Sequence, residues 1–346
     1  MAVRPLYENV CIEGLAVELP PHRVSSRELE AELLPTYRRL GISPGLIETL
    51  VGIVARRFWD EGTSIADAAA RVVGQVLADS GKDELWRARS GLLLSTSVCK
   101  DYLEPSVAAL VRGQLALPPT CEALDIGNAC LGFMNGMDLA ASWIESGRVH
   151  CALIVDAESS RFVVQETVKR LLLPSSTMAD FKEALPTLTL GSGAVAMLLV
   201  HRSLATHPSR RVRGAVSLGD PSSSTICLGT AGFMKTDAAA LLKNGVDLAQ
   251  RTFTIAQEHF AWTRDNVAQW LCHQVGATHL AALAGKLDLD LSRAFLTYPE
   301  LGNIGPAAVP ITMRLAIDDG RVRAGDRLGL MGIGSGLSCM MMEVQW

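Results

Sequence analysis

The sequence lacks the long apolar segments that mark membrane and secreted proteins. Its longest apolar runs, such as residues 194–200, are far shorter than the ~20 residues that span a bilayer. The first ten residues contain no apolar segment of the kind found in signal peptides. We therefore expect a cytoplasmic protein without a membrane span.

Basic patches and several common enzyme motifs are also missing. The 346 residues carry a formal net charge of −4, and the densest basic cluster (Arg210, Arg211 and Arg213) is short and has no aromatic residues between its arginines. We interpret it as a solvated loop and expect no nucleic-acid partner. The sequence contains no G-x-x-x-x-G-K-[ST], H-E-x-x-H or G-x-S-x-G motif, and the run GIGSGL at 332–337 has Leu337 where the dinucleotide motif requires its third glycine.

The cysteines do not form a metal or redox pattern. All eight lack a C-x-x-C partner and the close Cys/His spacing of a zinc site. We expect reduced thiols, mostly structural, and no metal ion. With 49% hydrophobic and 20% charged residues, the chain is expected to bury an extensive core in one large domain or in two of ordinary size.

The chain resembles itself. Residues 127–149 and 302–322 each open with Gly-Asn, continue as an amphipathic helix and close with Gly-Arg-Val. Residues 191–197 and 334–340 also match, as GSGAVAM and GSGLSCM, and each begins a strand-like run. Matched points in one order indicate an internal duplication. The alternative is two unrelated pairs of helix and strand that share only the glycines common at the ends of such elements.

The duplication divides the chain into an N-terminal half, residues 1–205, and a C-terminal half, residues 206–346. The first half is longer between the matched points, which places an insertion near residues 157–188. Residues 161–186 indicate a helix, a Pro-Ser-Ser break and a second helix, and we expect this insertion to cap a site. A Pro/Ser/Arg-rich stretch at 203–225 is expected to separate the halves.

Each half alternates short apolar runs with helical segments. Residues 91–98 and 268–275 are apolar runs bounded by polar residues, as expected for strands buried on both faces. Further strands are expected at 123–126, 151–155 and 327–333. Sheets covered by helices, built twice and packed about a pseudo-twofold axis, give a layered α/β fold in which equivalent loops of the two halves converge.

Cys130 follows a short strand and a turn of small residues, so it lies at the N-terminus of an expected helix. The unpaired N–H groups and partial positive charge of a helix N-terminus favour the thiolate, which is the form that attacks a carbonyl. The alternative is that Cys130 packs in the core, as free cysteines usually do.

His273 and Asn303 are expected to meet Cys130. If the halves pack about the axis, Asn128 and Asn303 occupy equivalent turns, and the strand that ends at His273 opens onto the same crevice. Cys130 would be the nucleophile, and His273 and Asn303 would donate hydrogen bonds to a thioester carbonyl as it becomes an enolate, while His273 could also relay a proton. The structural alternatives are a buried core histidine and an ordinary turn asparagine.

The glycine-rich segment 332–336 precedes the last strand-like run. Its backbone N–H groups, with that of Cys130, are candidates for an oxyanion hole. The alternative is a plain β-turn. The matching Gly-Ser-Gly at 191–193 indicates that part of this pattern is structural.

These motifs resemble those of the thiolase superfamily and, within it, the ketosynthase III-like condensing enzymes. The resemblance rests on Cys130 in NACLGF, His273 in CHQV, Asn303 in LGNIGPAAVP and the closing GIGSGL, and it spans nearly the whole chain. It implies a five-layered αβαβα fold, a homodimer and an acyl-cysteine intermediate. It also implies that the N–H groups of Cys130 and Ser335 form the oxyanion hole.

A finer resemblance is to bacterial enzymes that condense two acyl-CoA molecules head to head in long-chain olefin biosynthesis. It is carried by DYLEPS at 101–106, HQV at 273–275, GNIGPA at 302–307 and the terminal E-V-x-W. Two positions depart from the common pattern. Leu301 and Gly276 stand where many relatives carry His and Asn.

Glu104 separates two kinds of condensation. Ketosynthase III enzymes typically carry an apolar residue here, on a loop that reaches into the partner subunit's acyl pocket, whereas the head-to-head subfamily carries a glutamate proposed as the base. A Claisen condensation without decarboxylation must remove an α-proton from an unactivated thioester, which needs a base. The alternative is that Glu104 precedes Pro105 at a helix start, where an acidic side chain suits the helix dipole.

We therefore expect an acyltransferase that joins two long-chain fatty acyl-CoA thioesters into a 2-alkyl-3-oxoacyl product through acyl-Cys130. It would need no cofactor besides its coenzyme A substrates, and downstream enzymes of the olefin pathway are candidate partners. The rivals are a decarboxylative ketosynthase III-type 3-oxoacyl-carrier-protein synthase, a pyrone-forming ketosynthase and a non-catalytic acyl-binding subunit. The sequence gives neither the acyl chain length nor the carrier, coenzyme A or carrier protein, that delivers each chain.

Overall fold

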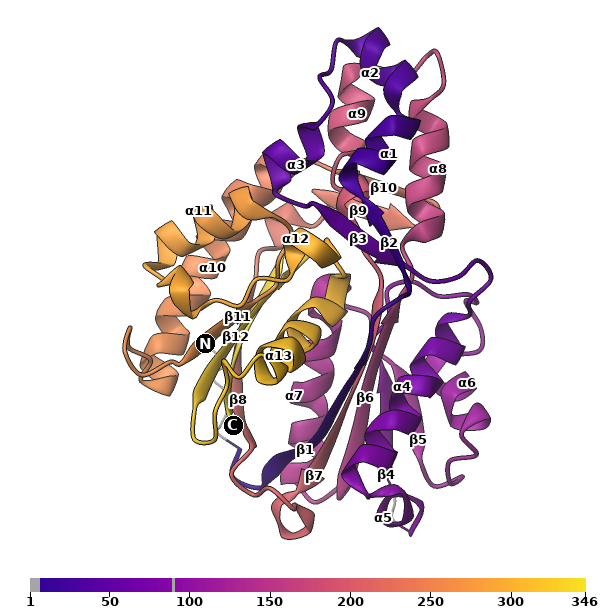
Figure 1. Ribbon diagram of the computed structural model, residues 1–346. Helices are drawn as coiled ribbons and strands as arrows, with labels where there is room; N and C mark the ends of the chain where they lie inside the picture. Colours follow the sequence, from indigo (N-terminus) through magenta and orange to yellow (C-terminus); the bar gives the residue numbers. More distant parts are fainter. Residues whose placement is uncertain (1–6, 89–90) are drawn as a thin grey trace.

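The strands of the computed structural model, which describes residues 7–88 and 91–346, repeat one order in the two halves of a nine-stranded sheet (Figure 1). The first half has the order β1 (Val10–Glu18), β7 (Gly193–His201), β6 (Cys151–Glu158), β4 (Gly91–Ser95) and β5 (Glu122–Asp125). The second half has the order β8 (Arg211–Gly219), β13 (Ser338–Gln345), β12 (Arg327–Gly334) and β11 (Gln269–Cys272), with a parallel bridge from Trp270 to Ala294 where a fifth strand would lie. Residues 1–6, which begin the segment discussed above for a signal peptide, lie outside the described residues.

Strand directions repeat as well as strand order. In each half the first two neighbouring pairs are antiparallel, and the pairs that follow, β6 with β4 and β12 with β11, are parallel. The duplication is therefore confirmed. The boundary that we place after residue 205 stays a prediction.

The halves join at one register pair, Cys11 of β1 opposite Arg211 of β8. The interpretation of residues 203–225 as a mere separator, and of the arginine cluster as a solvated loop, is wrong. β8 lies inside this stretch, and Arg211 and Arg213 are half-buried strand residues. Val212 between them is fully buried, so the segment alternates as a strand does. The basic composition of the segment concealed this alternation.

Five layers follow from how the helices cover the sheet (Figure 1). Helices α4 (Ile65–Ser80) and α6 (Val107–Gln114) cover the outer face of the first half, and α10 (Ala238–Phe260) and α11 (Ala277–Leu287) cover that of the second. Helices α7 (Gly132–Glu145) and α13 (Ala308–Asp318) lie between the two halves of the sheet. The predicted αβαβα fold is confirmed.

Alternating side chains hold these layers together. In β13, Met340 and Met342 join the central core around α7 and α13, whereas Cys339 and Met341 join the outer core under α10. Successive side chains of a strand point to opposite faces, so a strand covered on both faces is apolar throughout. This explains why the strands of this chain appear as continuous apolar runs.

The predicted insertion forms two helices, α8 (Arg161–Leu171) and α9 (Met178–Ala184), as expected. They pack with α1 (Ser26–Glu32) and α2 (Leu34–Leu40) at one end of the molecule, where the rings of Tyr37 and Phe181 lie 5.5 Å apart, edge to face (Figure 1). The role of this cap stays a prediction. The remaining elements are β2 (His22–Ser25), α3 (Leu46–Val51), β3 (Ala55–Phe58), α5 (Asp83–Ala88), β9 (Cys227–Thr230), β10 (Phe233–Thr236) and α12 (Tyr298–Leu301).

None of the helices in the described parts of the chain has both the length and the apolar character needed to cross a membrane.

Candidate active site

Cys130 lies in a tight turn between β5 and α7. A single 3-10 turn, η1 (Ala129–Leu131), leads directly into the helix, so the thiol is at the predicted N-terminal end. Ala129 has φ of 45°, a left-handed conformation that costs a non-glycine residue energy and is retained where the surroundings impose it. The side chain of Asn128 donates to Oδ1 of Asn135 at 2.7 Å and ties the turn to the first coil of α7.

The end of β12 packs against this turn. A Cβ atom on Gly332 would lie 2.5 Å from Cδ2 of Leu131, and one on Gly334 would lie 3.4 Å from the backbone nitrogen of Cys130. Glycine at both positions therefore lets the strand approach the nucleophile's own backbone. Ser335 follows at once. Within residues 7–88 and 91–346, the N–H of Ser335 donates no hydrogen bond, and the N–H of Cys130 donates to its own thiol and to no other residue.

Asn303 lies in the turn that enters α13, and this turn packs against the Cys130 turn. Its backbone N–H donates to the carbonyl of Thr189 at 2.9 Å, and its carbonyl accepts from the N–H of Gly191 at 2.8 Å. Its side-chain Oδ1 accepts from the N–H of Gly305 at 3.0 Å. Because Oδ1 is held this way, the amide NH₂ group stays available to donate.

The two turns match with a shift of one residue. The 3-10 turn η6 (Gly305–Ala307) corresponds to η1, because Ala129 and Gly305 both have positive φ and both begin these turns. Asn128 is the residue immediately before its turn, whereas Ile304 separates Asn303 from its own. The expected alignment of Asn128 with Asn303 is therefore wrong by one position, although both turns open toward each other.

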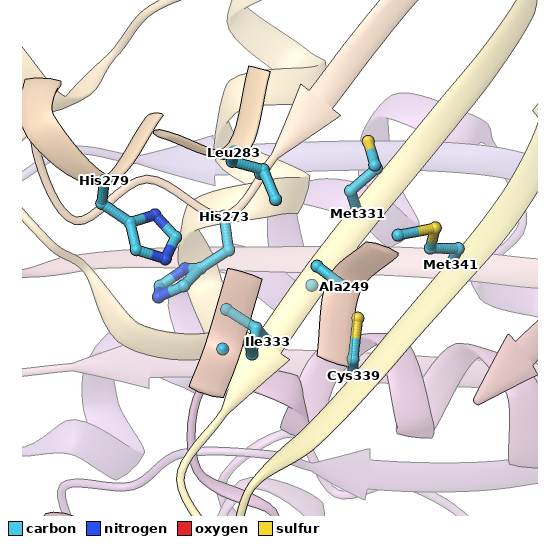
Figure 2. A pocket seen from close by; sticks show the side chains of 10 residues that line it. Ala249, His273, His279, Leu283, Met331, Ile333, Cys339 and Met341 are labelled. Atoms are coloured by element: carbon cyan, nitrogen blue, oxygen red, sulfur yellow. The ribbon is translucent and has the colours of Figure 1, made fainter. Parts of the chain in front are cut away.

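His273 directly follows β11, and its backbone N–H donates to the carbonyl of Met331 at 2.7 Å. Burial, with a smaller contribution from His279, lowers the pKa of His273 to about 3, so its imidazole is neutral near pH 7. Figure 2 shows the rings of His273 and His279 beside each other on one wall of a small cavity, with Leu283 and Met331 among its apolar lining. The buried Nδ1 atoms of both histidines have no hydrogen-bond partner among the described residues.

The thiol of Cys130 does not have the expected low pKa. Although part of the residue is exposed, its thiol is enclosed by protein, and this burial raises its pKa to about 12, with Glu158 as the next contribution. The expectation that the helix N-terminus favours the thiolate is wrong for the resting chain. Loss of hydration and a nearby carboxylate outweigh the helix dipole. The thiol therefore needs a base when it reacts.

Two acidic residues at the end of β6 were not predicted from the sequence. Asp156 and Glu158 are both buried, and Thr96 donates its hydroxyl to Asp156 at 2.6 Å. Burial raises the pKa of Glu158 to about 7, although hydrogen bonds from Cys99 and Val98 act in the opposite direction. The only signal was the run CALIVDAE, in which carboxylates interrupt an otherwise apolar strand.

Glu104 has no hydrogen bond or ion pair with the other predicted site residues in the described part of the chain. It belongs to an exposed loop between β4 and α6, beside Tyr102 and Leu103, whose exposed fractions are 60% and 96%. The alternative role of Glu104 at the start of α6 is not supported. Ser106 caps that helix by accepting from Ala109, and the carboxylate of Asp125 accepts from its first two N–H groups.

Two family models match this chain. Residues 124–215 match the 3-oxoacyl-[acyl-carrier-protein] synthase III family, and residues 258–346 match the family of its C-terminal part. The chain is 40% identical over 341 residues to the acyl-CoA:acyl-CoA alkyltransferase of Xanthomonas campestris pv. campestris, which covers 99% of this chain and 100% of the relative. It is 38% identical over 355 residues to the acyl-CoA:acyl-CoA alkyltransferase of Shewanella oneidensis, with 98% and 99% covered.

Solved structures of Xanthomonas campestris OleA are also similar. A variant with a cysteine replaced by serine, with bound lauric acid and lauroyl-CoA, has a TM-score of 0.95 at 40% identity and covers 99% of this chain and 100% of that chain. The cerulenin-bound protein has a TM-score of 0.95 at 40% identity, with 100% of both chains covered. Further variants of this relative replace a histidine or a glutamate by alanine.

Proposed function

This chain belongs to the 3-oxoacyl-[acyl-carrier-protein] synthase III family of the thiolase superfamily, and on that premise we propose that it joins two fatty acyl-CoA molecules by a Claisen condensation without decarboxylation. The relatives named acyl-CoA:acyl-CoA alkyltransferase support this reaction class, since they match almost the whole chain. The relative with bound lauroyl-CoA supports a long acyl chain on the substrate.

The first step loads one acyl group on Cys130. His273 takes the proton from the buried thiol as the sulfur attacks the thioester carbonyl, and coenzyme A leaves with a proton as its free thiol. A histidine is suited to this transfer because it is neutral beforehand. The resulting imidazolium and thiolate stabilise each other, which offsets the burial that raises the pKa of Cys130.

The second step forms the carbon–carbon bond. Glu104 of the partner subunit removes an α-proton from the second acyl-CoA, and the enolate oxygen accepts hydrogen bonds from His273 and from the side-chain amide of Asn303. The enolate carbon attacks acyl-Cys130, and the N–H groups of Cys130 and Ser335 receive the tetrahedral oxyanion. Cys130 then leaves as a thiolate and takes up a proton from solvent, while Glu104 releases the α-proton to solvent. The product is a 2-alkyl-3-oxoacyl-CoA or, after hydrolysis, the β-keto acid.

The environment of Glu104 is the observation that favours condensation without decarboxylation. Glu104 has no hydrogen bond or ion pair to any described residue. It lies in an exposed loop with the apolar Tyr102 and Leu103. The helix N–H groups nearby are already occupied by Ser106 and Asp125. A base that serves a second subunit accounts for both its isolation and its apolar neighbours.

We propose a homodimer that forms through the edge of the sheet. β5 pairs with β4 on one side and has no partner strand on the other among the described residues, and Leu124 on it is 43% exposed. An open strand edge is a template for pairing with a second chain. Lys100, in the Glu104 loop, contacts Asp125 at the end of β5 at 2.7 Å, so this edge and the loop would meet the partner together.

The decisive experiment supplies long-chain acyl-CoA as the sole substrate. Formation of a β-keto product, detected by mass spectrometry, supports the proposal. A strict requirement for a malonyl donor would instead support a decarboxylative synthase. Failure of Cys130 to become acylated would support a non-catalytic acyl-binding subunit. A screen across acyl-CoA lengths in the same assay gives the chain length.

We propose that coenzyme A thioesters suffice without a separate cofactor, that the reaction takes place in the cytoplasm and that the product passes to downstream enzymes of olefin synthesis. Full activity of the purified chain after exhaustive dialysis against a chelator tests the first of these. Activity that returns only with an added metal ion or cofactor would contradict it.

A further inference from the structure

The loop that carries Glu104 is fastened at its base by three carboxylates. Glu158 accepts hydrogen bonds from the backbone N–H groups of Val98 at 2.5 Å and Cys99 at 3.2 Å. Asp101 accepts from the hydroxyl of Ser64 and the N–H of Ile65, both at 2.8 Å, and Asp125 pairs with Lys100. Beyond this base, the tip formed by residues 102–104 is exposed. The base therefore fixes where the tip points.

Glu158 differs from the other two anchors because it is buried inside its own subunit. It is 5% exposed, and no lysine or arginine forms an ion pair with it among the described residues. Burying a carboxylate without a cation is costly unless hydrogen bonds replace its water. The two backbone N–H groups of the loop are those replacements, so the loop position and the charge of Glu158 depend on each other.

Glu158 also borders the reaction site of its own subunit. A Cβ atom on Gly305, in the turn after Asn303, would lie 3.8 Å from the carboxyl carbon of Glu158. The negative charge of the same carboxylate also raises the pKa of the Cys130 thiol. One side chain therefore contacts the turn of one active site and holds the loop proposed to serve the other.

We propose that Glu158 is a positioning residue that aims the Glu104 loop at the partner subunit, and so links the acyl-cysteine site of one subunit to the base of the other. This inference rests on the proposed delivery of Glu104 across a dimer. The link is one of contact, because the side chain that holds the loop also borders Gly305 in the turn after Asn303.

Asp156 provides a matched control. It lies two residues before Glu158 on the same strand, is also buried, and its charge also raises the pKa of the Cys130 thiol. Its hydrogen bond, however, comes from the side chain of Thr96, directly after β4, and not from the backbone N–H groups of Val98 and Cys99. Asp156→Asn and Glu158→Gln both remove one buried carboxylate near Cys130. Glu158→Gln alone replaces an acceptor of two loop N–H groups by an amide, whose NH₂ group cannot accept from either.

The first experiment separates loading from condensation. We expect Glu158→Gln to load acyl groups on Cys130, measured by intact mass, but to condense about 10- to 100-fold more slowly, as a misplaced reacting group does. Asp156→Asn is expected to condense within about threefold of the unmodified chain. Equal rates in Glu158→Gln and the unmodified chain would overturn the inference, as would equal losses in both variants.

The second experiment uses mixed dimers. A Cys130→Ala subunit paired with a Glu158→Gln subunit keeps an intact Glu104 loop facing the only remaining thiol, and is expected to condense. A subunit carrying both substitutions, paired with an unmodified subunit, presents a loosened loop to the only thiol and is expected to be slow. The opposite pattern would overturn the inference. If the unmodified chain itself makes no product from acyl-CoA alone, the proposed function fails instead.

Discussion

Replacing Gly191 by alanine should disable condensation by pushing Asn303 out of place. A Cβ atom at this position would lie 1.9 Å from the carbonyl oxygen of Leu301, whereas ordinary contacts begin at 3.4 Å, so the segment before Asn303 must move by about 1.5 Å. Gly191 does not have the left-handed φ that disfavours alanine, so the clash is the whole effect. Its N–H also donates to the carbonyl of Asn303, which transmits the shift directly.

The expected magnitude follows from this displacement. A shift of about 1 Å in a reacting group costs about 100-fold in rate, and overpacking a core costs about 1–3 kcal/mol in the free energy of unfolding. We expect condensation to fall by about 100-fold while Cys130 still becomes acylated, because in the proposed mechanism Asn303 stabilises the enolate of the second step.

Product formation from acyl-CoA, the mass of acyl-Cys130 and urea unfolding measure the three effects. Gly113→Ala is the control, since a Cβ on this exposed helix residue contacts nothing within 4 Å. Asn303→Ala removes the amide without crowding and should show the same separation of the two steps. A folded Gly191→Ala protein that condenses at the rate of the unmodified chain would refute the reasoning.

Three further predictions concern Glu104, His279 and Cys130. Glu104→Ala should still form acyl-Cys130 but lose condensation, and unchanged condensation in that variant would exclude Glu104 as the base. Burial lowers the pKa of His279 from 6.5 to about 4, so the unfolded chain binds a proton that the folded chain does not, and the free energy of unfolding falls as pH drops through this window. Between about pH 6 and pH 5, His279→Leu should therefore lose less free energy of unfolding than the unmodified chain, by up to about 1.4 kcal/mol per pH unit. Urea unfolding measures this difference, and an equal pH dependence in both proteins would contradict it. Alkylation of Cys130 by iodoacetamide should keep accelerating up to about pH 9, because burial raises the pKa of this thiol to about 12; a plateau near neutral pH would contradict the burial argument.

Internal repetition is what made the fold and the paired turns predictable. The matched Gly-Asn and Gly-Ser-Gly segments gave two halves, and a pseudo-twofold arrangement brings their equivalent loops together whatever the details of packing. The one-residue shift at Asn303 could not be predicted, because both segments open with the same Gly-Asn pair, at 127–128 and 302–303. Backbone conformation decides the match, and the positive φ of Ala129 is not visible in an alanine.

Properties that depend on distant segments could not be predicted. The pKa of Cys130 is raised first by burial among other segments and then by Glu158, Cys227 and Asp156, whereas the local pattern shows only a helix N-terminus. Glu158 ends an apolar strand, where a buried acid and a solvated one look alike in sequence. Glu104 was found through family resemblance, since its neighbours alone favour a role at a helix start.

The matched turns also fix the direction of the reaction. By its place in the 3-10 turn, Pro306 is the structural counterpart of Cys130, and proline has neither a thiol nor a backbone N–H. An ancestor with two identical halves would have offered two equivalent turns across its twofold axis. In this chain only one of them can hold a covalent acyl group and its oxyanion. The two acyl-CoA substrates therefore have fixed roles. The acyl group that arrives first always becomes the electrophile, and the later one always becomes the nucleophile.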